Sequence, residues 1–308
     1  MRPTCRMKFP SSVLLLLVLS VALTAAENPI TYLALGDSVS FGMNDALVPP
    51  YTNMPVTPSE FVGYPETLAA LRPPFSISSL ANAACPGETS GSFLNTAWPD
   101  NGCNSQHVVY PPPGSTLPPI YLPPFKPAVG LHVSYAESQM AYALSQLGRG
   151  NHVNLVSLMI GANDVLLVLP ELETCAPQPT CAQTVLGGVL EAYGNNLAQI
   201  LGGIRAVYSG TLVLVTYYAP SPALNSIAQA LNSTMTTVAA SFPGITIADG
   251  YKTFQLASAP FGGDPCAAGL LIKLPPNPYN SSACDIHPSP IGRDLLAATV
   301  DFALLSKL

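Results

Sequence analysis

Short apolar runs alternate with longer amphipathic segments along most of the chain. Apolar runs rich in β-branched and aromatic residues predict five buried strands, at residues 31–35, 75–80, 153–160, 211–217 and 245–249. Between them, four segments that are each followed by Gly or Pro within two residues predict helices, at residues 60–72, 135–147, 186–208 and 224–242. This alternation predicts an α/β fold, a three-layer α/β/α sandwich around a central, mostly parallel five-stranded sheet. In such sheets ligands bind beyond the carboxyl ends of the strands, so the residues that follow each strand are the first candidates for a site.

One segment does not fit the alternation. Residues 98–130 are rich in proline and contain no predicted strand or helix. Long irregular segments of compact domains are commonly functional, so we expect this one to shape a substrate site beside the sheet, with a proline-rich interaction motif as the alternative. No internal repeat and no linker divides the chain.

The first 26 residues have the layout of a secretory signal peptide. Arg2, Arg6 and Lys8 precede an apolar stretch at residues 13–23, and small residues follow it. We therefore expect export, removal of residues 1–26 and one folded domain at residues 27–308. An uncleaved membrane anchor is the alternative, although the apolar stretch is short for a span.

The chain contains few charged residues. Only 9% of its residues are charged and its net charge is −6, against about 25% charged residues in an average globular protein. Removing residues 1–26, with three positive and no negative side chains, gives 8 − 17 = −9. The absence of any basic run excludes a generic nucleic-acid-binding surface, and the high hydrophobic content argues against disorder.

Six cysteines remain after residue 26. An even number in an exported protein predicts three disulfides, and pairing sequence neighbours is the simplest of the fifteen arrangements. The predicted pairs are Cys85–Cys103, Cys175–Cys181 and Cys266–Cys284. A metal site is the rival interpretation, but the sequence contains no CxxC, HxH or HExxH motif.

Residues that could form a site follow several predicted strands. Ser38 lies in a Gly-Asp-Ser sequence after the first strand, Gly87 lies after the second, and Asn163 follows the third in Gly-Ala-Asn-Asp. Asp285 and His287 stand near the C-terminus, where His287 could act as a general base. Taken singly, each motif is also compatible with an ordinary turn or helix cap.

Together and in this order, the motifs resemble those of the SGNH hydrolase superfamily, the GDSL esterases and lipases. The resemblance runs from about residue 31 to residue 298, and the cysteine arrangement is similar to that of secreted bacterial members with three disulfides. It implies a flavodoxin-like SGNH hydrolase fold, Ser38 as nucleophile and His287 as base. The implied oxyanion hole consists of the N–H groups of Ser38 and Gly87 and the side-chain amide of Asn163.

Two positions depart from the family pattern. Val39 replaces the leucine of the GDSL motif, which is a hydrophobic exchange. The family's acidic residue usually stands three positions before the histidine, where this chain has Cys284. Asp285, two positions before His287, would share its face on an extended segment and could orient it. The alternative is a Ser–His dyad in which the backbone carbonyl of Cys284 holds the imidazole.

The resemblance thus implies a secreted, monomeric serine esterase or lipase that acts on small-molecule or lipid esters and needs no metal or organic cofactor. It predicts neither a nucleic-acid partner nor a membrane span in the mature chain. Two alternatives stay open, a carbohydrate acetyl-esterase of the same superfamily and a disulfide-stabilised secreted binding domain with an inactive site.

Overall fold

A computed structural model describes residues 30–71, 77–112, 114–148, 152–175, 178–280 and 282–305. The predicted signal peptide, residues 1–26, lies outside the described residues, as do the first two residues of the predicted strand 75–80.

The centre of the molecule is a five-stranded sheet in which every neighbouring pair is parallel. Its spatial order is β2-β1-β5-β6-β7, which is the flavodoxin-like order: β2 lies on one side of β1, and the later strands are added on the other side, beginning with β5. The predicted five-stranded α/β fold is therefore confirmed. The strands are β1 (Ile30–Gly36), β2 (Ile77–Asn82), β5 (Leu155–Met159), β6 (Thr211–Val215) and β7 (Ile245–Ala248).

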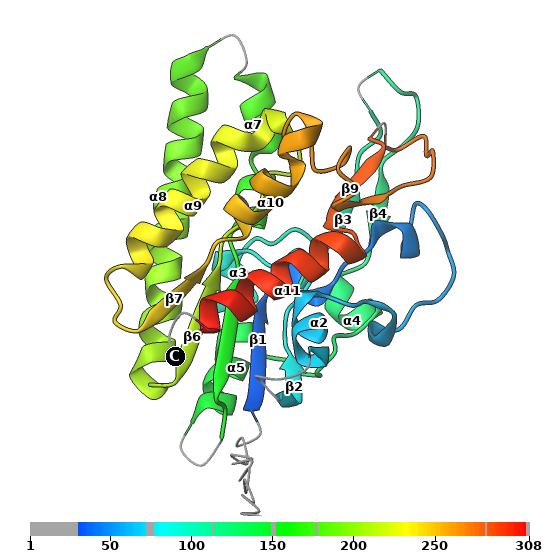
Figure 1. The fold of residues 1–308 in the computed structure, drawn as a ribbon. Coiled ribbons are helices and arrows are strands. Elements are labelled where there is room, and N and C mark those ends of the chain that lie inside the picture. The colour runs from blue at the N-terminus through cyan, green and yellow to red at the C-terminus, as the bar shows by residue number, and fades with distance from the viewer. Residues whose placement is uncertain are drawn as a thin grey trace, which may run out of the picture.

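Helices cover both faces of this sheet (Figure 1). Helix α2 (Tyr64–Ala70) packs against α11 (Pro290–Leu305) on one face, and α10 (Gly250–Ser258) contacts α11. On the other face α8 (Pro179–Val207) contacts α3 (Ser90–Leu94), α5 (Gln139–Leu147) and α9 (Asn225–Ala239). Because both faces are covered, the central strands are buried along their whole apolar runs rather than at alternate residues.

The remaining elements are short and join or follow the main ones. They are α1 (Ser38–Phe41), η1 (Asp45–Leu47), η2 (Pro58–Glu60), β3 (His107–Val109), β4 (Ile120–Leu122), α4 (Phe125–Ala128), α6 (Ala162–Leu166), α7 (Leu169–Thr174), η3 (Pro222–Leu224), η4 (Ala259–Phe261), β8 (Leu271–Lys273) and β9 (Cys284–Pro288). Helices α1 and α6 directly follow β1 and β5, so they begin at the carboxyl edge of the sheet.

Helix boundaries differ from the predicted ones where capping decides them. Helix α5 begins at Gln139, four residues after the predicted start, because the Ser138 side chain caps it by accepting the N–H of Ala141. Helix α8 begins seven residues before its predicted start, with Pro179 in the first turn, where a missing N–H costs no intrahelical bond.

The sequence predicts no strand or helix in the proline-rich segment 98–130, and this prediction is wrong. The segment contains the antiparallel hairpin β3–β4 and the short helix α4. Each strand has only three residues, because prolines at positions 111, 112, 118, 119, 123 and 124 remove the backbone donors that a longer ladder needs.

All three predicted disulfides are present, linking Cys85 to Cys103, Cys175 to Cys181 and Cys266 to Cys284. No helix in the described ranges combines the length and the hydrophobicity required to cross a bilayer.

Candidate active site

Ser38 is the first residue of α1, directly after the carboxyl end of β1. The turn requires glycine at position 36, where φ is 139° and a Cβ atom would lie 2.1 Å from the Met159 carbonyl oxygen. Asp37 caps the short helix by accepting the Val39 N–H at 3.0 Å. The turn therefore holds Ser38 at the edge of the sheet with its side chain only partly buried.

Gly87 lies in the turn that follows β2, in a conformation that a side chain would prevent. Its φ is 81°, and a Cβ atom would lie 2.4 Å from the Asn101 carbonyl oxygen. Among the described residues, neither the Gly87 N–H nor the Ser38 N–H donates to a protein acceptor. Both groups are thus open to a ligand oxygen.

Asn163, the second residue of α6, follows the carboxyl end of β5 and is held at both ends of its amide. Its Nδ2 donates to the Glu88 carbonyl at 3.0 Å, and its Oδ1 accepts from Asn101 Nδ2 at 3.1 Å. Because Nδ2 carries two hydrogens, one remains for another acceptor. Asn101 belongs to the proline-rich segment, and the sequence contained no signal for this contact.

Asp285 and His287 lie two residues apart on β9, and both are buried. Asp285 Oδ1 lies 2.7 Å from His287 Nδ1 and accepts the His287 backbone N–H at 3.2 Å. An ionised carboxylate only accepts, so Nδ1 carries the proton and Nε2 has the free lone pair when the ring is neutral. The Cys284 carbonyl, the alternative partner, accepts instead from the Ser282 hydroxyl at 2.7 Å.

The surroundings of His287 make its imidazole more basic. Burial alone would lower its pKa, but the charge and hydrogen bond of Asp285 raise it, and the net effect raises the pKa of His287 to about 9. A second carboxylate contributes, since Asp45 Oδ1 lies 3.5 Å from His287 Nδ1. The sequence reasoning did not find Asp45, which follows the Ser38 helix in an ordinary Asn-Asp turn.

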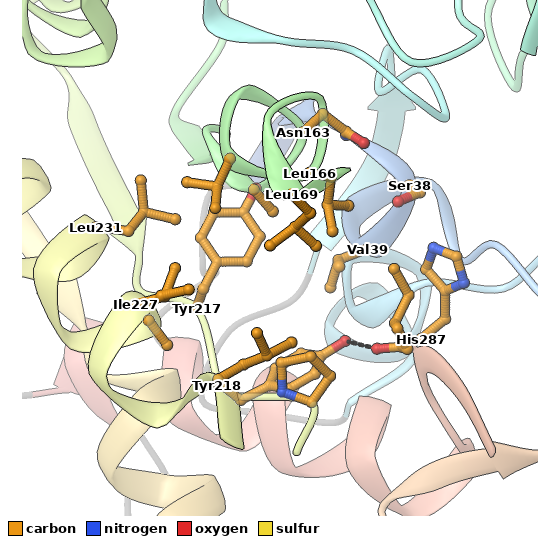
Figure 2. A pocket seen from close by; sticks show the side chains of 16 residues that line it. Ser38, Val39, Asn163, Leu166, Leu169, Tyr217, Tyr218, Ile227, Leu231 and His287 are labelled. Carbon is orange, nitrogen blue, oxygen red and sulfur yellow. Dashed lines mark hydrogen bonds between the residues drawn. The ribbon is translucent and has the colours of Figure 1, made fainter. Parts of the chain in front are cut away.

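Ser38, Asn163 and His287 line two adjacent cavities, and Gly87 lines the second of them. The first is almost entirely apolar and extends to Ile227 and Leu231 on α9. Figure 2 shows Ser38 and His287 at one end of this cavity and the α9 side chains at the other. The second cavity is bounded by residues of the β3–β4 hairpin and by Asp45. Four of the five predicted site residues are thus brought together around these cavities, and Asp285 lies behind His287.

Buried polar side chains hold the turn that contains Ser38. Gln139 accepts the Gly36 N–H at 2.6 Å, donates to the Gly36 carbonyl at 2.9 Å, and donates to Glu88 Oε2 at 3.1 Å. The Tyr217 hydroxyl donates to Asp37, where burial raises the carboxyl pKa to about 6. The Gln139 contacts thus connect the end of β1, just before Ser38, with the segment after β2 that contains Gly87. Sequence patterns did not identify Gln139 or Tyr217, because each acts across a long separation.

Two groups within the described residues place enough ligand atoms together for a metal ion. The first group consists of Cys85, Cys103 and Glu88. Its two cysteines are joined in a disulfide and therefore offer no thiolate to an ion. In the second group, Asp45 and Asp285 face the protonated ring nitrogen of His287. Because Nδ1 carries a proton toward Asp285, it has no lone pair to offer an ion.

No family model and no curated protein matches the sequence. Solved structures do match. The extracellular lipase from Streptomyces rimosus has a TM-score of 0.51 and 18% identity, over 89% of this chain and 99% of that one. The chain has the SGNH hydrolase fold. A phospholipase A1 from Streptomyces albidoflavus matches 91% of the chain and 100% of its own length at 18% identity, with a TM-score of 0.48.

The esterase EstA from a Pseudoalteromonas species, solved with monoethylphosphonate as inhibitor, is also similar. It has 15% identity over 90% of this chain and 97% of its own, with a TM-score of 0.45. The likeness to the Streptomyces rimosus lipase, at 18% identity, shows the fold alone. The chemistry has to be argued from the side chains that this chain places at the edge of its sheet.

Proposed function

We propose that the chain is an exported serine esterase or lipase that hydrolyses carboxylic esters through an acyl-enzyme on Ser38. The observation that carries the proposal is the 2.7 Å contact between Asp285 Oδ1 and His287 Nδ1, next to a cavity that Ser38 also lines. A nucleophile, an oriented base and open N–H donors around one cavity are the parts that acyl transfer requires.

In the proposed first half-reaction, His287 Nε2 accepts the Ser38 hydroxyl proton while Ser38 Oγ attacks the ester carbonyl. Asp285 keeps the Nδ1 proton in place and offsets the imidazolium charge that forms. The oxyanion receives hydrogen bonds from the N–H groups of Ser38 and Gly87 and from the free Nδ2 hydrogen of Asn163. His287 then protonates the leaving alcohol.

In the second half-reaction, a water molecule replaces the alcohol. His287 accepts a proton from that water while the water oxygen attacks the acyl carbon. The bond from the acyl carbon to Ser38 Oγ then breaks, His287 returns the proton to Oγ, and the carboxylic acid leaves. Neither half-reaction calls for a metal or an organic cofactor.

The apolar cavity supports an acyl chain as its occupant. Nearly all its surface is hydrocarbon, and it runs from Ser38 and Val39 toward Leu231. Burying one methylene there contributes about 0.8 kcal/mol, or about fourfold in kcat/KM. This lining favours acyl lipids and alkyl esters over acetylated carbohydrates as substrates.

Export is part of the proposal and rests on two features. Residues 1–26 have the pattern of a signal peptide, and three disulfides lie within the domain proposed at residues 27–308. We propose that this domain acts as a monomer.

A panel of p-nitrophenyl esters of increasing acyl length, assayed beside acetylated xylan, tests the proposal. We expect turnover of the aryl esters, and Ser38→Ala should lower kcat by about 10⁶-fold, as removal of other serine nucleophiles does. The matched control is Ser233→Ala, which removes an exposed hydroxyl on α9.

Three outcomes separate the candidate functions. Activity that survives in Ser38→Ala overturns the nucleophile assignment. Preferential release of acetate from xylan favours the carbohydrate acetyl-esterase. No turnover of any ester by the intact protein favours the secreted binding domain.

A further inference from the structure

Asp45 lies next to the base of the site without any structural task that explains its carboxylate. It is the first residue of η1, and the preceding Asn44 caps that turn by accepting the Ala46 N–H at 3.1 Å. The backbone N–H of Asp45 donates to Asp285 Oδ2 at 2.9 Å, a bond that any residue other than proline would provide. Among the described residues, no backbone N–H donates to the Asp45 carboxylate. Its acidic side chain therefore needs another explanation.

The carboxylate of Asp45 faces the same ring nitrogen that Asp285 holds. Asp45 Oδ1 lies 3.5 Å from His287 Nδ1, and Asp285 Oδ1 lies 2.7 Å from it. The Asp45 side chain is 37% exposed and lines the cavity next to Ser38, whereas the Asp285 side chain is fully buried. His287 is consequently flanked by one buried and one cavity-facing carboxylate.

We propose that Asp45 is a second acidic positioning residue for His287. It helps Asp285 to orient the imidazole, and it accepts the hydrogen bond of the Nδ1–H group when Asp285 is removed. This inference rests on the proposed function, because it concerns the base of the same site. Asp45 takes part in no bond-making step. It offsets the imidazolium charge that arises when the Ser38 proton moves to Nε2, and the Nδ1 proton stays on the ring.

Other groups around His287 do not replace Asp45 in this role. Asp37, the remaining carboxylate that acts on His287 electrostatically, already accepts from the Val39 N–H and the Tyr217 hydroxyl. The Tyr218 hydroxyl donates to the Ile286 carbonyl at 2.7 Å. Tyr51, which feels the charges of Asp45 and Asp285, accepts from Asn280 at 2.8 Å.

The two carboxylates also influence each other. Partial burial raises the pKa of Asp45, the nearby His287 lowers it, and Asp285 raises it again, with a net rise. In contrast, the charge and hydrogen bonds of His287 lower the pKa of Asp285 despite the burial of that carboxyl. Asp285 therefore holds the negative charge more firmly, and Asp45 adds a second charge as the pH rises.

The test is a double-mutant cycle on the complete chain, using Asp45→Asn, Asp285→Asn and the double variant. Each asparagine keeps the size of the side chain, and Asp45→Asn keeps the backbone bond to Asp285. Where a histidine base has a single acidic partner, its replacement by asparagine costs about 10⁴-fold in kcat. With Asp45 in reserve, we expect Asp285→Asn to cost only about 10- to 100-fold and the double variant about 10⁴-fold, as a coupled pair predicts.

The pH profile supplies a readout that a purely structural role would leave unchanged. Asp45→Asn alone should lower the pKa in kcat/KM by about one unit, since an adjacent negative charge stabilises the imidazolium. Asp301→Asn is the control, because Asp301 is a partly exposed carboxylate on α11 that lines neither cavity. It should leave both the rate and the pH profile unchanged.

The inference is overturned if the double variant loses no more activity than Asp285→Asn, or if Asp285→Asn alone costs the full factor. If Asp285→Asn does not fold, the pH shift of Asp45→Asn decides, and an unchanged profile overturns it. Failure of the proposed function would look different, because the intact chain would then hydrolyse no ester or Ser38→Ala would retain activity, whatever the carboxylate variants do.

Discussion

Removing the Asn163 side chain should slow catalysis without weakening substrate binding. Asn163 is only 3% exposed, and its amide is held between the Glu88 carbonyl and Asn101 Nδ2, so the remaining Nδ2 hydrogen points in a fixed direction. Loss of one preorganised oxyanion donor costs about 100- to 1,000-fold in kcat, or about 2.7–4 kcal/mol of transition-state stabilisation. The uncharged carbonyl of the bound ester gains little from that donor, so KM should stay nearly constant in Asn163→Ala.

The same variant has a cost in folding stability that can be separated from its effect on the rate. Two hydrogen bonds are lost, at about 1 kcal/mol each, so the free energy of unfolding should fall by about 2 kcal/mol. Asn232→Ala is the matched control. Asn232 is also buried and bonded at both ends of its amide, to the Tyr217 N–H and carbonyl at 2.8 and 2.7 Å. It should lose similar stability, and the loss of kcat that it causes through Tyr217 should stay well below that of Asn163→Ala.

The assay is steady-state hydrolysis of p-nitrophenyl butyrate, combined with urea unfolding of the three proteins. The reasoning about the oxyanion is refuted if folded Asn163→Ala keeps its kcat within a factor of about three, well short of a lost donor's effect. It is equally refuted if the loss appears only in KM, or if Asn232→Ala loses as much kcat.

Three further predictions concern the base, the acyl cavity and the disulfide beside the base. Catalysis needs neutral His287, whose pKa is raised from 6.5 to about 9, so kcat/KM should increase with pH up to about 9. A midpoint near 6.5 in the pH profile of kcat/KM would contradict the contacts of His287 with the two carboxylates. Ile227→Trp should shorten the cavity and shift preference in the ester panel toward shorter acyl chains, with about fourfold in kcat/KM lost for each methylene that no longer fits. An unchanged chain-length profile would show that acyl chains bind elsewhere. Replacing both Cys266 and Cys284, which are 18 residues apart, by serine should lower the free energy of unfolding by about 3 kcal/mol in urea titrations, and equal stability would show that the loop is constrained without the bond.

The sheet could be predicted because its central strands are buried on both faces. The runs at residues 31–35 and 211–217 are nearly continuous apolar stretches, so their ends are visible in the sequence. Once the strands are parallel, the residues that follow β1, β2 and β5 must meet at one edge. This brings Ser38, Gly87 and Asn163 together from positions far apart in the chain.

What the sequence did not reveal depends on contacts between irregular segments. Asn101 supports Asn163 from a loop, and Gln139 holds Gly36 from the start of a helix, neither with any periodic pattern. Asp45 reaches His287 across more than two hundred residues, through a turn whose residues are typical of many turns. The hairpin β3–β4 has strands of only three residues, which are too short for alternation to be recognised.

Covalent labelling tests the central claim, that Ser38 is the residue acylated during ester hydrolysis. The full chain would be treated with an alkyl fluorophosphonate, which traps a serine activated by an adjacent base, and its mass measured intact and after digestion. The account predicts one adduct per chain on the peptide that contains Ser38, none in Ser38→Ala, and slower labelling in Asp285→Asn. An adduct on any other residue, or none in a protein that still hydrolyses esters, would contradict it.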